Sequence, residues 1–142
     1  MASKLDKTIQ EYWADRAPGL KLSAQVLLKS DTAVKSRLYH YLRDVKPGKA
    51  LDMGTGAGYM ALELARMGYA VTAIDYTKEV IDVAEEISEE IGIKVDFKVG
   101  DVIEPDLPEG QYDLITARNT VWGLTDPYRA YASWKRLLKP GG

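Results

Sequence analysis

The sequence predicts an α/β fold, in which a parallel sheet has helices on both faces and further helices precede it. Three observations lead to this prediction. A glycine-rich turn over residues 54–58 follows a short apolar run and opens a helical pattern. A second run, over 70–74, is almost entirely apolar, which is typical of a buried parallel strand. From there on, strand patterns and helical patterns alternate along the chain.

The first segment predicts a short helix. Leu5, Ile9 and Trp13 are spaced four residues apart, so they share one face. The dipeptide 18–19, proline followed by glycine, is expected to break the chain after this helix.

Two more helices are expected before the sheet. One starts at about Leu20, with Asp31 as an internal cap, and the next covers 32–44. We therefore expect an N-terminal helical segment over residues 1–45 and an α/β domain over 46–142, which form one compact domain overall.

The second part of the chain predicts four strands, each followed by a helix or a loop. In order, these are a strand over 49–52, a helix from Met60 to Arg66, a strand over 70–74, a helix capped by Thr77 and ended by Gly92, an edge strand over 95–99, a strand over 112–117, and a helix that starts at Asp126–Pro127 and ends at Leu138.

The spacing of the glycines indicates the kind of ligand. A dinucleotide fingerprint reads G-x-G-x-x-G, whereas this turn reads D-x-G-x-G-x-G and has Tyr59 at the third position of the fingerprint. The carboxylate of Asp52 favours a ligand with positive charge over a pyrophosphate. Asp75 follows the second strand, where an acidic residue accepts both hydroxyls of a ribose. That feature fits NAD and S-adenosylmethionine equally well.

Composition excludes several other functions. The 142 residues include no cysteine and one histidine, His40, so neither a disulfide nor a metal cluster is expected. Residues 75–113 carry 13 acidic and three basic side chains, which argues against a nucleic-acid partner. No apolar run is long enough to span a membrane, and we expect a cytoplasmic protein.

The first motif, Asp52 to Gly58, resembles that of the class I S-adenosylmethionine (SAM) dependent methyltransferases position by position. The resemblance implies a Rossmann-like fold in three layers, SAM as the cofactor, and S-adenosylhomocysteine as the product. It places the ligand against Gly54, Gly56 and Gly58. No catalytic residue is implied, because an acceptor that is already nucleophilic needs no base.

Other segments resemble the same family. In that family the helices before the first strand form part of the substrate lid, so the resemblance implies a lid segment over residues 1–45 and a SAM-binding domain over 46–142. Tyr12 to Ala17 is similar to the Y-W-x-x-R-A segment of small-molecule methyltransferases, which implies that Tyr12 and Arg16 reach the methionine carboxylate; an aromatic pair that anchors the N-terminus is an equal alternative. Tyr76 is implied to lie against the adenine. The remaining implied contacts are Asp101 with the adenine amino group and the Val102 N–H with a ring nitrogen. In the segment that begins with Arg118 and Asn119, backbone carbonyls are implied to hold the SAM ammonium and side chains to face the methyl group.

The resemblance implies the strand order 3-2-1-4 for the first four strands and a sheet that continues through strands five, six and seven. This sequence departs from the family there, and we expect a sheet truncated after the fourth strand and its helix. The last residues, from Trp134 to Gly142, match the family's turn into a fifth strand. The fourth strand is then expected to have an open edge, and a homodimer through this strand and the last helix would cover it.

Three functions remain open. We favour a SAM-dependent methyltransferase that acts on a small-molecule acceptor. A non-catalytic SAM-binding or dimerising module is the second hypothesis, and an NAD(P)-dependent oxidoreductase is the least favoured.

Overall fold

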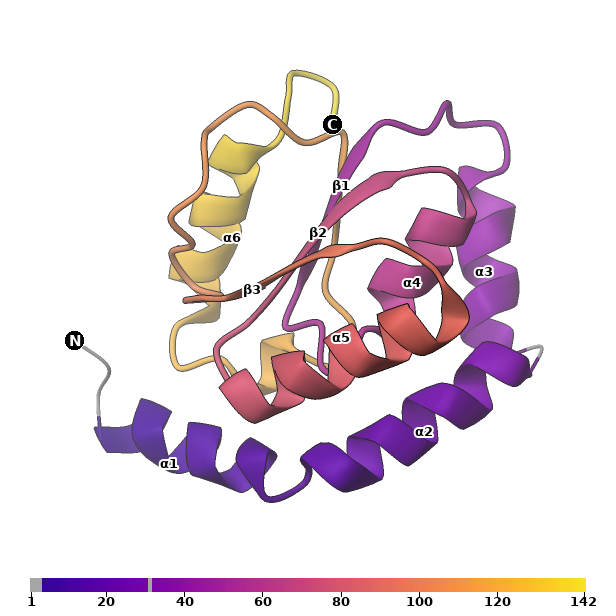
Figure 1. Ribbon diagram of the computed structural model, residues 1–142. Coiled ribbons are helices and arrows are strands. Elements are labelled where there is room, and N and C mark those ends of the chain that lie inside the picture. The colour runs from indigo at the N-terminus through magenta and orange to yellow at the C-terminus, as the bar shows by residue number, and fades with distance from the viewer. Residues whose placement is uncertain (1–3, 31) are drawn as a thin grey trace.

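The computed structural model describes residues 4–30 and 32–142 of the chain. Four parallel strands form one sheet in the order β3-β2-β1-β4 (Figure 1). The strands are β1 (Lys49–Met53), β2 (Ala70–Asp75), β3 (Asp96–Val99) and β4 (Leu114–Thr116). The predicted fold class and the strand order are confirmed.

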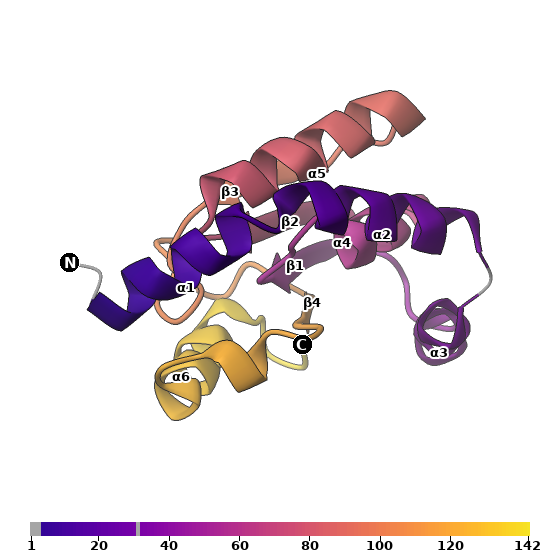
Figure 2. The ribbon, with the colours of Figure 1, turned by 90° about the horizontal axis from the view of Figure 1, so that it is seen from below.

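Helices cover both faces of the sheet and the edge at which its strands end. They are α1 (Lys4–Ala14), α2 (Ala17–Lys29), α3 (Ala33–Leu42), α4 (Tyr59–Arg66), α5 (Lys78–Ile91), the 3₁₀ turn η1 (Val121–Gly123) and α6 (Pro127–Leu137). Figure 2 shows α5 and α6 on opposite sides of the sheet, and α1 and α2 run in front of the strands.

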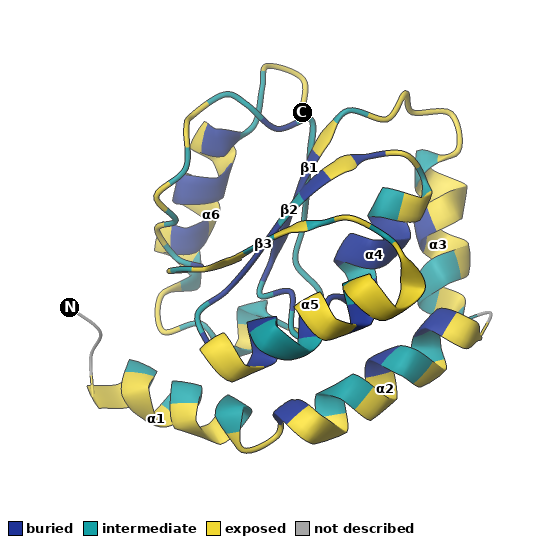
Figure 3. Cartoon of the chain, in the orientation of Figure 1, coloured by how far each residue is buried: buried dark blue, intermediate teal, exposed yellow. Residues whose placement is uncertain are grey.

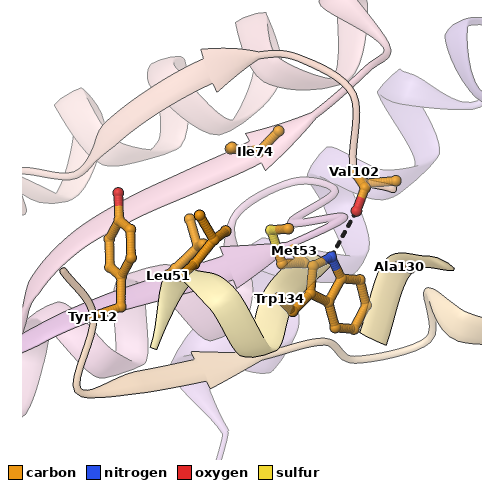
Figure 4. Close-up of a cluster of buried hydrophobic side chains, with 8 residues drawn as sticks. Leu51, Met53, Ile74, Val102, Tyr112, Ala130 and Trp134 are labelled. Carbon is orange, nitrogen blue, oxygen red and sulfur yellow. Dashed lines mark hydrogen bonds between the residues drawn. The ribbon is translucent and has the colours of Figure 1, made fainter. Parts of the chain in front are cut away.

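Side chains from alternate positions of the strands form two separate cores. Leu51 and Met53 of β1 pack with Trp134 and other residues of α6 on one face (Figure 4). Ala50 lies on the opposite face, in a cluster that includes Leu64 of α4. This alternation, with period two, is the reason that β1 is buried on both sides.

Helices α1 and α2 differ in how firmly they are attached. Ala24 and Leu28 of α2 are buried against α4 and α5, and Lys21 forms ion pairs with Glu86 and Glu90 on α5. In contrast, none of the residues of α1 is buried (Figure 3). Helix α1 is therefore the more weakly held of the two.

The structure corrects the prediction that residues 18–19 break the chain. Pro18 and Gly19 lie in the first turn of α2. A proline is tolerated there, because the first N–H groups of a helix have no partner within the helix. The short break falls at Asp15 and Arg16 instead.

Three smaller differences concern element ends. Strand β4 is shorter than the predicted 112–117, and Tyr112 forms an isolated parallel bridge with Leu138 instead. Thr77 is at the N-cap position of α5, but its side chain makes no capping hydrogen bond. The predicted cap at Asp31 lies outside the described residues.

Among the helices that the structure describes, none has the length and apolar character needed to cross a membrane.

Candidate functional site

Two neighbouring cavities lie where the strands end. The first has a volume of about 290 Å³ and lies between the glycine turn and helices α1 and α2. The second, of about 420 Å³, lies between the end of β3 and α1. Tyr76, Val102, Gly123 and Leu124 line both, so the two cavities meet along one wall. Ligands of open α/β sheets bind at this edge of the sheet.

Two glycines of the turn differ in the space beside their Cα atoms: Gly56 borders open space, whereas Gly54 packs against a side chain. Gly56 has a φ of +56°, and a Cβ added there would meet no atom within 4 Å. A Cβ at Gly54 would lie 2.4 Å from the Thr120 side chain. Gly54 and Gly56 line the first cavity, and Gly58 precedes α4 as its N-cap residue. The open space beside Gly56 is where the backbone can approach a ligand closely.

Asp52 lies beneath this turn. Its side chain is buried, and its two oxygens accept hydrogen bonds from the hydroxyls of Thr55 and Thr116, each at 2.7 Å. Burial raises the pKa of Asp52 to about 6, although these hydrogen bonds oppose the shift. Asp52 lines neither cavity, and its role toward a ligand stays a prediction.

Asp75, at the end of β2, does line the first cavity. Its Oδ2 accepts a hydrogen bond from the Gly56 N–H at 3.1 Å, and its Oδ1 accepts one from the Thr77 N–H at 3.0 Å. Burial raises the pKa of this carboxyl, and the backbone donors oppose that shift. Each oxygen has a second lone pair, so the carboxylate can accept two more hydrogen bonds from a ligand.

The end of β3 supplies the wall of the second cavity. Asp101 and Val102 line it together with Tyr76. Asp101 Oδ1 accepts hydrogen bonds from the N–H groups of Ile103 and Glu104, at 2.7 and 3.3 Å. The Val102 carbonyl accepts a hydrogen bond of 2.7 Å from Nε1 of Trp134, the dashed line in Figure 4. Helix α6 thus holds this loop in place.

The segment after β4 packs against the glycine turn. Arg118, Asn119 and Thr120 all line the first cavity. The Thr120 hydroxyl donates toward the carbonyls of Met53 and Gly54, at 3.0 and 3.2 Å. Asn119 has a φ of +56°, an uncommon conformation for a residue other than glycine, which turns the chain at the cavity wall.

The two residues predicted from the N-terminal segment lie apart from these cavities. The Arg16 guanidinium carbon is 3.5 Å from the centroid of the Tyr12 ring, and Arg16 Nη1 donates to the Tyr12 carbonyl at 3.0 Å. Both side chains are exposed and neither lines a cavity. Their contact with a cofactor stays a prediction.

Several residues of the site are not predicted from the sequence. Trp13 and Trp122, whose ring centroids are 6.2 Å apart, line the first cavity from α1 and η1. Gln10 Nε2 donates to the Tyr76 carbonyl at 3.1 Å, which joins α1 to the end of β2. The sequence offers one signal for these two residues, since Trp13 and Trp122 are two of only three tryptophans.

Within residues 4–30 and 32–142, no group of acidic, histidine or cysteine side chains has the arrangement of a metal site.

Comparisons with known proteins agree with this geometry. The methyltransferase domain family matches residues 51–142. A ubiquinone biosynthesis O-methyltransferase of Xanthomonas oryzae pv. oryzae is 32% identical over 99% of this chain, and the chain spans 58% of that relative's length.

Two solved structures show the same arrangement of elements. One is a candidate S-adenosyl-L-methionine-dependent methyltransferase of Methanococcus maripaludis, with a TM-score of 0.74 and 21% identity, over 100% of this chain and 63% of that one. The other is phosphoethanolamine N-methyltransferase 2 of Haemonchus contortus, solved with phosphomonomethylethanolamine and S-adenosylhomocysteine. It has a TM-score of 0.70 and 25% identity, over 76% of this chain and 26% of that one. Since the family match covers more than half of the residues, the chain belongs to the methyltransferase domain family, and its fold is that of the class I SAM-dependent methyltransferases.

Proposed function

We propose that this chain binds SAM and forms the cofactor-binding part of a methyltransferase for a small-molecule acceptor. The observation that carries the proposal is the Asp75 carboxylate in the wall of the first cavity, next to the open space beside Gly56. Two backbone N–H groups fix its orientation, and free lone pairs remain for the two hydroxyls of a ribose. The adenosine half of SAM has those hydroxyls.

The details of the turn favour SAM over a dinucleotide. In the G-x-G-x-x-G fingerprint, the third glycine allows the helix and strand to pack closely. Here Tyr59 has that position, and its hydroxyl is bonded to the Thr32 hydroxyl at 2.8 Å. The nearby carboxyls of Asp52 and Asp75 would repel a pyrophosphate at neutral pH, whereas they would attract a sulfonium ion.

Methyl transfer from SAM requires the protein mainly to position the reactants and to exclude water. When bound, SAM supplies an activated methyl group that a nucleophile displaces in line. The chain's own residues would orient the adenosine through Asp75 and exclude water through Trp13 and Trp122. No base is assigned, because a nucleophilic acceptor reacts without one.

The wall of the first cavity supports a largely apolar acceptor. Apart from the cofactor-facing loops, its lining is mostly apolar, with Ile9 and Trp13 from α1, Leu20 and Leu27 from α2, and Trp122 from η1. Oxygen is proposed as the acceptor atom because the relative from Xanthomonas oryzae is an O-methyltransferase. A cytoplasmic location is part of the same proposal.

Calorimetry with the 142-residue chain tests cofactor binding. We expect SAM and S-adenosylhomocysteine to bind and NAD to show no binding at the same concentrations. Tight binding of NAD, or no binding of either SAM or its product, would refute the proposal. Transfer of labelled methyl from SAM to catechol, as a test acceptor, would show that the chain is an active enzyme and would exclude a module that only binds the cofactor.

A further inference from the structure

The functional residues lie in a line along the edge of the sheet. Because the strand order is β3-β2-β1-β4, a path along this edge passes Asp101, then Asp75, then the glycine turn, then Arg118. Neighbouring strands are about 4.8 Å apart, so the path covers about 14 Å. A ligand whose ribose is held at Asp75 and whose base lies toward Asp101 directs its other end past the glycine turn toward Arg118.

Arg118 is suited to receive a negatively charged end. It supplies the one cationic side chain among the described residues that line the first cavity. Its guanidinium carbon lies 5.4 Å from the centroid of the Tyr59 ring, a cation–π distance. No carboxylate in the described part of the chain forms an ion pair with it. The half-buried guanidinium therefore lies against an aromatic ring in a mostly apolar cavity and has no ion-pair partner among residues 4–30 and 32–142.

The position of Arg118 is fixed by its neighbours. Thr120 holds the same loop to the carbonyls of Met53 and Gly54, at the base of the glycine turn. The Tyr59 ring that supports the guanidinium is buried and bonded to Thr32. A charged group held in this way loses little conformational entropy when it binds a ligand.

We propose that Arg118 binds the carboxylate at the amino-acid end of the cofactor. This inference rests on the proposed function, because it presumes that the cofactor is SAM. It assigns the carboxylate to Arg118 in place of Arg16, whose exposed guanidinium lies on the Tyr12 ring and lines neither cavity. A planar guanidinium can bind a carboxylate through two parallel N–H···O bonds.

The test compares two ligands that differ only in the carboxylate. S-adenosylhomocysteine has it, and S-adenosyl-3-thiopropylamine keeps the amine and lacks it. In the wild-type chain, we expect the first ligand to bind about ten- to a hundredfold more tightly, as measured by calorimetry. In Arg118→Gln, the affinity for S-adenosylhomocysteine should fall by the same factor, whereas the affinity for the decarboxylated ligand should stay within about twofold. Equal affinity for that second ligand also demonstrates that the variant is folded.

Two further variants make the assignment specific. Arg43→Gln, on the exposed ion pair with Asp44, is the control and should bind both ligands as the wild type does. Arg16→Gln tests the alternative cation. The inference is wrong if Arg16→Gln shows the selective loss, if Arg118→Gln weakens both ligands equally, or if Arg118→Gln binds both like the wild type, as an anion site for the acceptor would predict. If the wild type binds neither ligand, the proposed function itself fails.

Discussion

Asp52 and Asp75 are buried carboxyls on neighbouring strands, but their hydrogen-bond donors give them different tasks. Asp52 is bonded to two side-chain hydroxyls, from the glycine turn and from β4, so it joins three segments of the fold. Asp75 is bonded to two backbone N–H groups and lines the cavity. The first carboxyl shapes the turn, and the second is available to a ligand.

The burial of Asp52 predicts a pH dependence of stability. Its pKa is about 6 in the folded state, and about 3.9 is usual for an unfolded chain. The folded state therefore binds this proton more tightly, so the contribution of Asp52 to stability is greatest below about pH 4. It decreases as the pH rises through about 6, by about 2–3 kcal/mol in total.

Asp52→Asn removes this titration and tests the prediction. Urea unfolding between pH 4 and pH 8 should show that the free energy of unfolding of the variant, minus that of the wild type, rises by about 2–3 kcal/mol up to about pH 7 and then stays level. A difference that is constant across this range would show that Asp52 titrates normally.

A substitution at Gly56 is expected to affect ligand binding in addition to stability, whereas one at Gly110 is expected to affect stability alone. Gly56 and Gly110 both have a positive φ, +56° and +62°, and a Cβ at either would meet no atom within 4 Å. Alanine at either site should therefore destabilise the fold similarly, by about 1 kcal/mol from backbone strain. Only Gly56 lines the cavity, so only Gly56→Ala should weaken the binding of S-adenosylhomocysteine, by about tenfold or more in calorimetry. Equal binding by the two variants would show that the ligand does not approach Gly56.

Helix α1 closes the cavity with few contacts to the rest of the molecule. Gln10 is bonded to the Tyr76 carbonyl, and Trp13 contacts Trp122, but no residue of the helix is buried. Helix α4, in contrast, has five buried residues and lies between the sheet and α2. An element with so little buried surface opens at a low free-energy cost.

Hydrogen exchange should detect this opening. We expect the amides of α1 to exchange through local opening, at least about a hundredfold faster than those of α4, and to be slowed by saturating S-adenosylhomocysteine. Amides of α4 exchange through larger unfolding events and serve as the internal reference. Protection of α1 equal to that of α4 without ligand would mean that α1 is a fixed part of the fold.

Local sequence patterns predict the elements better than they predict contacts between them. The strand at 70–74 and the helix that ends at Gly92 follow from periodicity and cap residues, and both are present. The contact between Gln10 and Tyr76 joins residues 66 positions apart, and neither residue has a local pattern that indicates it. The same holds for Thr116 and Thr120, whose hydroxyls bond to the glycine turn and its base only after β4 has paired with β1.

A second limit of sequence-based prediction concerns where helices and strands begin and end. Proline is compatible both with a break and with the first turn of a helix, and the sequence alone does not separate the two at Pro18. The end of β4 is similar, since Tyr112 has the apolar character of a strand residue but bridges to Leu138 on the other side. In both places the packing of neighbouring elements determines where the helix or strand begins.

At the scale of the whole molecule, the sheet has an open edge along β4. This strand pairs with β1 on one side, and on the other side the described residues supply only the bridge between Tyr112 and Leu138. Leu114 and Ile115 pack into the cores on opposite faces, so the strand is well placed to extend a sheet. On the neighbouring helix α6, Tyr128 and Tyr131 are 87% and 52% exposed.

We predict that the 142-residue chain self-associates through this edge and through α6. A second copy can pair with the unpaired N–H and C=O groups of β4, and the two tyrosines add apolar surface to a two-fold interface. Sedimentation velocity should therefore show a dimer whose population rises with concentration. Tyr128→Lys should weaken association by about tenfold, because it replaces apolar surface by a charge, and Tyr41→Lys, at a tyrosine that is 75% exposed on α3, should leave it unchanged. A wild-type chain that sediments as a monomer at the highest concentrations would contradict the prediction. Equal weakening by the two substitutions would place the interface elsewhere.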